Sequence, residues 1–303
     1  MTGVAAAVLL AHRRSVGHQA PSPGISLPVG ETSVVTTDDG ADLAVLVAGP
    51  EHGPTVVLAH CWTGMQAIWA IVAECLVADG YRVVLYDQRG HGQSTNSDAA
   101  PSIAVLGHDL RAVLEAVDAH GAVLVGHSMG GMSIQSYAAE HALDFAERVR
   151  GVVLVATAAK VLGRTVPASA VERLMGEGRS EWMRRGALGR RVARGALGKG
   201  ATRAHVELTL EGLAATTGIA RAGFLTAMAT MDLRDAGRIL GTVPTRVLVG
   251  TRDTLTPPRL GRRLAGGIPG ADLEVIPGAG HMLPLERPDE IVAAIRVMAL
   301  APG

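Results

Sequence analysis

The chain has 303 residues, enough for one large domain or two modest ones. Its 28 Lys and Arg residues balance its 28 Asp and Glu residues. No net charge draws it to nucleic acid, and we expect no nucleic-acid partner. The only cysteines are Cys61 and Cys75, a number that fits neither a disulfide-rich framework nor a zinc site.

The first thirty residues differ in composition from the rest. The apolar stretch at residues 4–11 is too short to span a bilayer, and Arg13 and Arg14 follow it, whereas a signal peptide places its positive charges first. Residues 15–30 are rich in Pro, Gly and Ser. We expect residues 1–30 to be an N-terminal extension and the protein to be cytoplasmic, with peripheral membrane association left open.

Regular elements begin at residue 31. Two apolar segments around Asp38, Asp39 and Gly40 predict a hairpin. Continuous apolar, β-branched runs suit strands that are buried on both faces of a parallel sheet. Six such runs follow, at residues 55–60, 82–87, 122–127, 151–157, 245–251 and 273–277. Helical patterns separate most of them, at residues 68–79, 103–120, 129–141, 258–265 and 288–300. This alternation predicts an α/β fold, with a mostly parallel, open eight-stranded sheet and helices on both faces.

One interval breaks the alternation. Between residues 157 and 245 there is no strand candidate, only helix-compatible segments with interposed glycines. Half of all Lys and Arg residues lie between residues 160 and 238, but only a quarter of the Asp and Glu residues do. We expect a basic helical insertion here.

A G-x-S-x-G pentapeptide, GHSMG, covers residues 126–130 and lies directly between a predicted strand and a predicted helix. Such a sequence makes a sharp strand-to-helix turn that exposes the serine oxygen above the sheet. The alternative is a tight turn without chemistry. The context favours Ser128 as a nucleophile.

A serine hydroxyl needs a base to take its proton and a carboxylate to orient that base. His281, in a glycine-rich loop after the last predicted strand, is the best candidate base. His60 and His91 are rivals that precede Ser128, and His127 is expected to pack or hydrogen-bond within the turn.

Asp253 is the best candidate acid, because it follows a predicted strand and completes the chain order serine, acid, histidine. Asp87 also ends a strand but precedes Ser128. The other common position, after residues 151–157, offers no acid. The alternative for Asp253 is a turn or helix-capping residue.

Acyl transfer also needs N–H donors for the oxyanion. We expect one at Met129, where the helix begins, and the second in the loop after residues 55–60, with Trp62 as the best candidate.

These motifs together resemble the α/β-hydrolase fold family, in its compact bacterial branch of serine-nucleophile esterases, lactonases, C–C bond hydrolases and cofactor-free haloperoxidases. The resemblance covers residues 31–300. It is carried by HCW (60–62), YDQRGHGQS (86–94), GHSMGG (126–131), GTRDTLTPP (250–258) and GAGHMLPLERP (278–288). It implies a core of residues 31–157 and 241–303, with residues 158–240 as a helical cap over the site. Residues 89–92 would form a structural turn. Cys61 stands where the family usually has glycine, which bears on the donor at Trp62.

The predicted chemistry is hydrolysis of a carboxylic ester or related acyl bond through an acyl-enzyme on Ser128, with no metal or organic cofactor. A serine at this position sets the chain apart from the dehalogenases and epoxide hydrolases of the fold, which use aspartate. Acyl transfer or perhydrolysis with the same triad stays open, as does a ligand-binding protein without turnover.

The expected partner is a small molecule, and methionines in the cap hint that it is apolar: Met175, Met183, Met228 and Met231. A basic run in the cap could contact an anionic lipid weakly, although such runs are more often solvated faces: Arg184, Arg185, Arg190, Arg191 and Arg194. The substrate's identity and the oligomeric state stay open.

Overall fold

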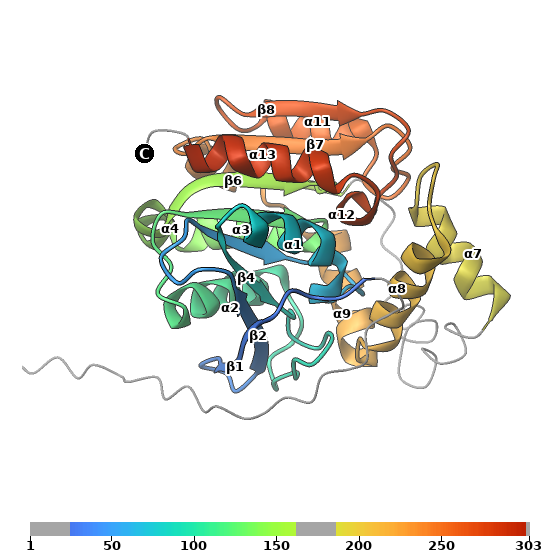
Figure 1. Cartoon of the computed structure of the whole chain (residues 1–303), viewed down its shortest axis with the longest axis horizontal. Coiled ribbons are helices and arrows are strands. Elements are labelled where there is room, and N and C mark those ends of the chain that lie inside the picture. Colours follow the sequence, from blue (N-terminus) through green and yellow to red (C-terminus); the bar gives the residue numbers. More distant parts are fainter. Residues whose placement is uncertain (1–24, 162–185, 301–303) are drawn as a thin grey trace, which may run out of the picture.

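The computed structural model describes residues 25–161 and 186–300, and a single eight-stranded sheet organises them (Figure 1). The strand order is β1-β2-β4-β3-β5-β6-β7-β8. The strands are β1 (Gly30–Thr36), β2 (Asp42–Ala48), β3 (Thr55–Ala59), β4 (Arg82–Tyr86), β5 (Ala122–His127), β6 (Val149–Val155), β7 (Thr245–Gly250) and β8 (Asp272–Ile276). β2 runs antiparallel to β1 and to β4, and every other pair is parallel. The predicted α/β fold with a mostly parallel eight-stranded sheet is confirmed.

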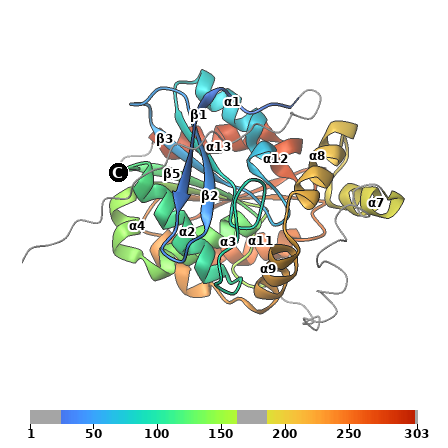
Figure 2. The same ribbon diagram turned by 90° about the horizontal axis from the view of Figure 1, so that it is seen from below.

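Helices cover both faces of the sheet (Figure 2). One face carries α1 (Ala70–Ala78), α12 (Leu283–Glu286) and α13 (Pro288–Leu300), and the other carries α2 (Ile103–Ala116), α3 (Met129–Glu140), α4 (Ala142–Arg148) and α11 (Pro258–Gly266). Side chains alternate between these layers: Val56 and Leu58 of β3 pack with the first set, and Val57 packs with the second. All residues of β3 and β5 are buried, as expected for central parallel strands.

Some element boundaries differ from the sequence prediction. The helix expected at residues 68–79 begins as a 3₁₀ turn, η1 (Gln66–Trp69), and continues as α1. The helix expected at residues 103–120 ends at Ala116, because Asp118 adopts a positive φ of 49° and the chain turns toward β5. The short helix α4 was not predicted, since seven residues hold too few turns for a clear hydrophobic period.

Three helices of the interval between β6 and β7 lie beyond the carboxyl ends of the parallel strands: α7 (Ala187–Ala196), α8 (Arg203–Ala214) and α9 (Gly218–Thr230) (Figures 1 and 2). The 3₁₀ turn η2 (Arg234–Ala236) and helix α10 (Gly237–Leu240) pack instead against α3. Residues 1–24 of the predicted extension and residues 162–185 of the predicted cap, with Met175, Met183, Arg184 and Arg185, lie outside the described residues. Across the described ranges, no helix is long and apolar enough to cross a bilayer.

Candidate active site

Ser128 occupies the turn between β5 and α3 with an unusual backbone, φ 51° and ψ −113°. Hydrogen bonds hold this conformation on both sides. The Ser128 N–H donates to the carbonyl of Val155 at 2.9 Å, and the Thr157 hydroxyl donates to the Ser128 carbonyl at 2.7 Å. A positive φ costs free energy for a residue with a Cβ, so it persists only where its surroundings enforce it.

Glycines make this turn sterically feasible. A Cβ on Gly126 would lie 2.5 Å from the carbonyl oxygen of Gly130, and a Cβ on Gly130 would lie 2.2 Å from the carbonyl oxygen of Ala59. Helix α3 therefore begins in direct backbone contact with the central strands. Ser128 is brought to their carboxyl ends, where open α/β sheets form their sites.

Asp253 and His281 come from the loops after β7 and β8, and they form a buried pair. The Nδ1 atom of His281 lies 2.9 Å from Oδ2 of Asp253, and the side chains are 6% and 0% exposed. Facing a carboxylate, Nδ1 carries the proton, which leaves Nε2 as the basic nitrogen. His281 lines the same cavity as Ser128.

The carboxylate of Asp253 accepts further hydrogen bonds. Its Oδ1 accepts the N–H groups of Leu255 and Thr256 at 2.9 and 2.8 Å, an Asx-type turn. Burial raises the pKa of Asp253, but the attraction of His281 and the hydrogen bonds from His281 and Thr256 outweigh it. The pKa therefore lies below its usual value and the group is ionised. The side chain of Asp253 therefore both stabilises the turn at residues 253–256 and orients His281.

Two residues in the site, Thr256 and Glu286, had no counterpart in the sequence interpretation. The Thr256 hydroxyl lies 2.6 Å from Oδ2 of Asp253, 2.8 Å from the carbonyl oxygen of Ala156 and 3.1 Å from Nδ1 of His281. The carboxylate of Glu286, on α12, accepts the N–H of Gly280 beside His281. A threonine three residues after an acid is a weak signal, since hydroxyl-to-carboxylate contacts of this kind depend on the folded loop.

His127, expected to pack or hydrogen-bond in the turn, does both. Its Nε2–H donates to the carbonyl of His281 at 2.8 Å, and the two rings lie 5.0 Å apart. Burial is the main cause that lowers the pKa of His127 to about 3, so its ring is neutral. It contacts the backbone of the candidate base without competing for its role.

The rival histidines support the loop that carries Trp62. His60 is fully buried; its Nδ1 contacts the Cys61 carbonyl at 2.7 Å, and its Nε2 accepts the Gln88 N–H at 2.8 Å. Burial lowers the pKa of His60 well below its usual value. His91 is likewise buried beside His60, and burial lowers its pKa to about 4. Both rings are neutral packing groups.

Asp87, the rival acid, anchors the same loop. Its carboxylate accepts the backbone N–H groups of Gln66 and Gln93 at 2.8 and 3.0 Å. Burial raises the pKa of Asp87 to about 6, against the lowering effect of these hydrogen bonds. Its hydrogen bonds thus go to the start of η1 and to its own loop, and none goes to His281.

The two candidate oxyanion donors come from the start of α3 and from the loop after β3. The N–H of Met129 is in the first turn of α3, where helix N–H groups lack intrahelical partners. The N–H of Trp62 has no acceptor among the described residues, and its indole Nε1–H donates to the carbonyl of Arg221 at 3.1 Å. Cys61 beside it is buried, and burial raises the pKa of its thiol to about 12, which keeps it protonated.

A cavity of about 310 Å³ opens above Ser128. Its walls are apolar and come mainly from α7, α8 and α9, together with the Trp62 loop. No carboxylate, lysine or arginine lines it within the described ranges. The aliphatic part of the wall includes Ile68, Met132, Val161, Leu208, Leu210, Leu213, Leu225, Met228 and Leu255.

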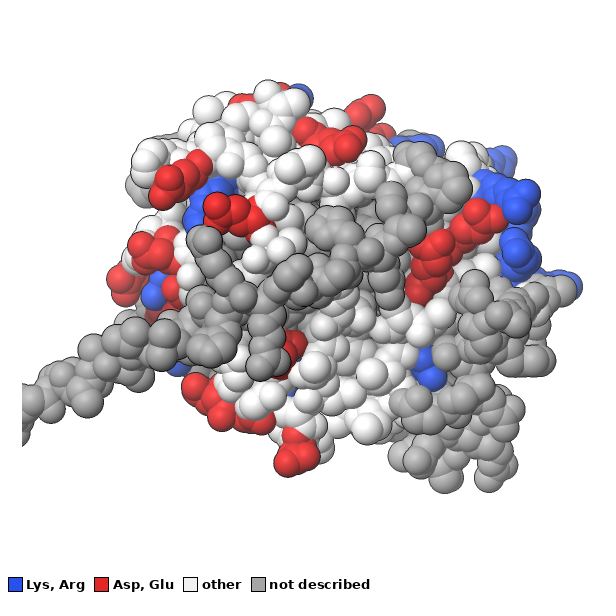
Figure 3. All heavy atoms as spheres, turned by 60° about the horizontal axis from the view of Figure 1, so that its bottom comes forward, with Lys and Arg blue, Asp and Glu red and all other residues white. Residues whose placement is uncertain are grey.

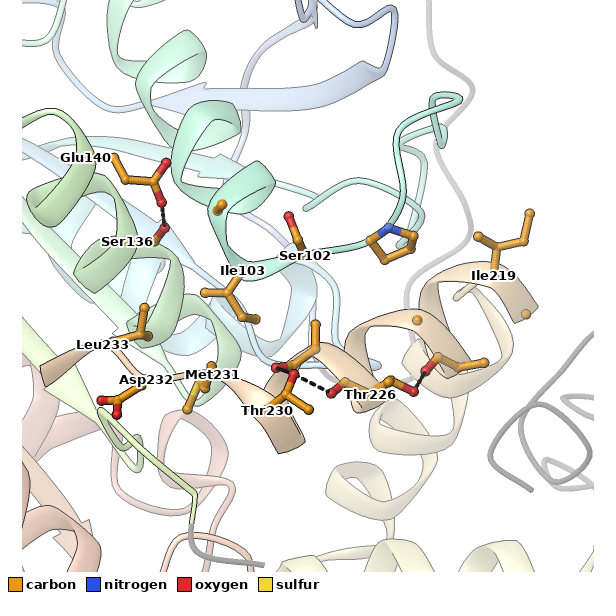
Figure 4. Close-up of a pocket in the computed structure, with 16 residues that line it drawn as sticks. Ser102, Ile103, Ser136, Glu140, Ile219, Thr226, Thr230, Met231, Asp232 and Leu233 are labelled. Atoms are coloured by element: carbon orange, nitrogen blue, oxygen red, sulfur yellow. Dashed lines mark hydrogen bonds between the residues drawn. The ribbon is translucent and has the colours of Figure 1, made fainter. Parts of the chain in front are cut away.

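A larger groove of about 740 Å³ lies elsewhere, between α2, α3 and α9, and is lined by Ile103, Ile219 and Met231 (Figure 4). Its polar groups satisfy one another or the helix backbone: Ser136 donates to Glu140, and Thr226 donates to the carbonyl of Ala222. It contains none of the candidate site residues. The candidate residues Ser128 and His281 line the smaller cavity instead.

The predicted basic run is partly visible. Arg190, Arg191 and Arg194 are exposed on α7. Figure 3 shows basic side chains gathered near α7 and α8, with acidic side chains beside them. On α8, for example, Arg203 forms an ion pair with Glu207 at 2.6 Å. Weak contact with an anionic lipid stays a prediction.

Comparison with known proteins places this architecture. A family profile described as the alpha/beta hydrolase family matches residues 56–294. The chain is 26% identical over 273 residues to a 3-oxoadipate enol-lactonase from Acinetobacter baylyi, and the aligned region covers 86% of this chain and 93% of that protein. It is 36% identical over 110 residues to a bifunctional esterase/perhydrolase from Acinetobacter calcoaceticus, and this shorter alignment covers 36% of this chain and 40% of that protein. The chain thus spans about two fifths of the length of the first curated relatives that it matches.

Among solved structures, an esterase from Rhodococcus sp. ECU1013 superposes with a TM-score of 0.77 and 26% identity, over 90% of this chain and 99% of that one. The profile match extends from β3 to α13 and so includes the strands that carry the candidate site. The chain belongs to the alpha/beta hydrolase family.

Proposed function

We propose that this protein hydrolyses carboxylic esters of small, apolar substrates through an acyl-enzyme on Ser128. The observation that carries this proposal is the buried Asp253–His281 pair, whose His281 lines the same apolar cavity as Ser128. We further propose that a cap lies within residues 158–240, of which η2 and α10 pack on the core, and that α7, α8 and α9 are the part of the cap that lines the cavity.

In this mechanism the Ser128 Oγ attacks the ester carbonyl carbon while His281 Nε2 takes the hydroxyl proton. Ionised Asp253 holds Nδ1–H and stabilises the imidazolium that forms. The N–H groups of Met129 and Trp62 donate to the oxyanion. His281 then protonates the departing alkoxide, and a water activated by the same Nε2 hydrolyses the acyl-enzyme. The alcohol and the acid are the products, and Ser128 recovers its proton.

The apolar wall supports a neutral, apolar acyl group as the recognised part of the substrate. An ionised substrate group would lose its hydration in this cavity without gaining a charged partner from the described residues that line it. Short-chain aryl esters are therefore suitable probes.

A fluorophosphonate that reacts with activated serines tests the proposal. We expect wild type to be labelled and to hydrolyse aryl esters, and Ser128→Ala to lose both properties. Ser136→Ala, a serine on the same helix that lines the separate groove, is the matched control and should keep both. An unlabelled wild type, or full esterase activity in Ser128→Ala, would overturn it.

Perhydrolysis is a second candidate, because a relative matched over 110 residues is named a bifunctional esterase/perhydrolase. Here peroxide in place of water attacks the acyl-enzyme and gives a peracid. Product analysis with and without added hydrogen peroxide separates the two: a peracid that depends on both peroxide and Ser128 supports perhydrolysis, and acid alone supports hydrolysis.

A further inference from the structure

The connection between α7 and α8 lies directly on the loop that carries His281. The carbonyl of Ala196 accepts the N–H of His281 at 2.8 Å, and the N–H of Lys199 donates to the carbonyl of Gly278 at 3.2 Å. These bonds join segments about eighty residues apart in the sequence. The proposed cap therefore contacts the backbone of the candidate base itself.

One carboxylate bridges the two segments. Oε2 of Glu286 accepts the N–H of Gly198 at 2.8 Å and the N–H of Gly280 at 2.9 Å. A Cβ on Gly198 would lie 2.5 Å from this oxygen and 2.5 Å from the nitrogen of Gly280. The two backbones and the carboxylate are thus in direct contact, with no space for water or another side chain between them.

The opposite side of His281 is held by the serine turn, because His127 donates to the His281 carbonyl at 2.8 Å. The N–H of His281 is bound by the α7–α8 connection, its carbonyl by the turn and its Nδ1 by Asp253. On the connection side, the hydrogen bonds of the backbone depend on a carboxylate group that the proposed mechanism does not use. That group is Glu286.

We propose that Glu286 is a positioning residue for His281. One of its carboxylate oxygens accepts the N–H groups of Gly198 and Gly280, and this fixes the α7–α8 connection to the loop that carries His281, here called the base loop. Charge-assisted hydrogen bonds from backbone N–H groups are short and directional, so one carboxylate can hold both segments. Proton transfer needs the base within about 0.5 Å of its productive position, which a loop of Gly278, Ala279 and Gly280 does not secure by itself. The inference rests on the proposed function.

The experiment compares Glu286→Ala and Glu286→Gln with a matched control, Glu290→Ala. Glu290 is a half-buried carboxylate four residues further on, whose ion pair is with Arg287 at 3.6 Å and not with the base loop. We expect Glu286→Ala to lower kcat between about 10- and 100-fold with little change in KM, because a displaced catalytic group loses rate at that scale. Glu286→Gln should recover most of kcat, since its amide oxygen can accept both bonds. Glu290→Ala should match wild type.

A second readout does not depend on turnover. Amide hydrogen exchange at residues 278–281 and 196–199 should accelerate together in Glu286→Ala and stay slow in Glu286→Gln and Glu290→Ala. Should wild type fail to react with a fluorophosphonate, the proposed function fails while the exchange still decides whether Glu286 joins the two segments. If Glu286→Ala does not fold, Gly198→Ala takes its place in both measurements, because its Cβ forces the connection away from Glu286.

The inference is overturned by unchanged kcat in Glu286→Ala, by a loss confined to KM and thermal stability, by a Gln variant as poor as the Ala variant, or by exchange that rises at only one of the two segments.

Discussion

At the residue scale, Ser128, the proposed nucleophile, is held in a backbone conformation that its residue type disfavours. Its φ of 51° and ψ of −113° lie in a sparsely populated region that costs an L-residue on the order of 1–3 kcal/mol. The surrounding hydrogen bonds and the glycines on either side keep it there. The strained backbone of Ser128 therefore lowers the stability of the fold at the turn where the proposed role needs an accessible hydroxyl.

Two substitutions at Ser128 isolate this strain, because neither retains the hydroxyl. Ser128→Gly should be more stable than Ser128→Ala by about 1 kcal/mol, since glycine adopts a positive φ without a Cβ clash. Urea denaturation of the two variants measures the difference. Equal stability, or a more stable Ala variant, would show that the turn carries no strain.

Asp253→Asn tests the carboxylate that faces His281. An amide can keep its oxygen toward the N–H groups of Leu255 and Thr256, but its NH₂ then points at Nδ1 of His281 and selects the wrong tautomer. We expect kcat to fall by on the order of 10³–10⁴ with little change in thermal stability. The exposed Asp272→Asn is the control, and a kcat within a few-fold of wild type in Asp253→Asn would contradict the role.

At the element scale, α9 lies between the apolar cavity at Ser128 and the larger outer groove. Ala229 lines the cavity at Ser128, and Ala222 on the same helix lines the outer groove of Figure 4. Side chains of this helix therefore limit the space beside the proposed nucleophile.

The substitution Ala229→Phe should shorten the acyl chain that is accepted. Losing room for one methylene changes selectivity by roughly 10-fold or more. The ratio of kcat/KM for hexanoate to acetate aryl esters should fall by at least that factor, while Ala222→Phe leaves the ratio as in wild type. An unchanged ratio in Ala229→Phe would remove α9 from the pocket.

The strands were predictable from the sequence, and so was the chain order of Ser128, Asp253 and His281, because each candidate lies shortly after the end of an apolar run. The contacts of Thr256 and Glu286 were not, since they join loops that only the folded sheet brings together. The cavity wall was equally out of reach. Helix α9 is apolar around much of its circumference, and no period in its sequence distinguishes the face toward Ser128.

At the scale of the whole molecule, buried neutral histidines couple the fold to pH. His60, His91 and His127 are fully buried, and burial lowers the pKa of all three, to about 4 for His91 and about 3 for His127. In the unfolded chain each histidine binds a proton near pH 6.5. Asp87 has the opposite effect, because burial raises its native pKa to about 6, so the folded state binds its proton first.

The free energy of unfolding should therefore fall as the pH drops from about 6.5 toward 4. Below pH 6.5 the unfolded chain takes up histidine protons that the native core excludes, which costs up to ~1.4 kcal/mol per pH unit for each histidine. Protonation of native Asp87 between about pH 6 and 4 offsets about one of the three. Urea midpoints at several pH values measure the slope. In His91→Phe, whose ring still packs near Phe224 but cannot bind a proton, the slope should decrease by one histidine's share. A slope that His91→Phe leaves unchanged would mean that His91 already binds its proton in the folded protein.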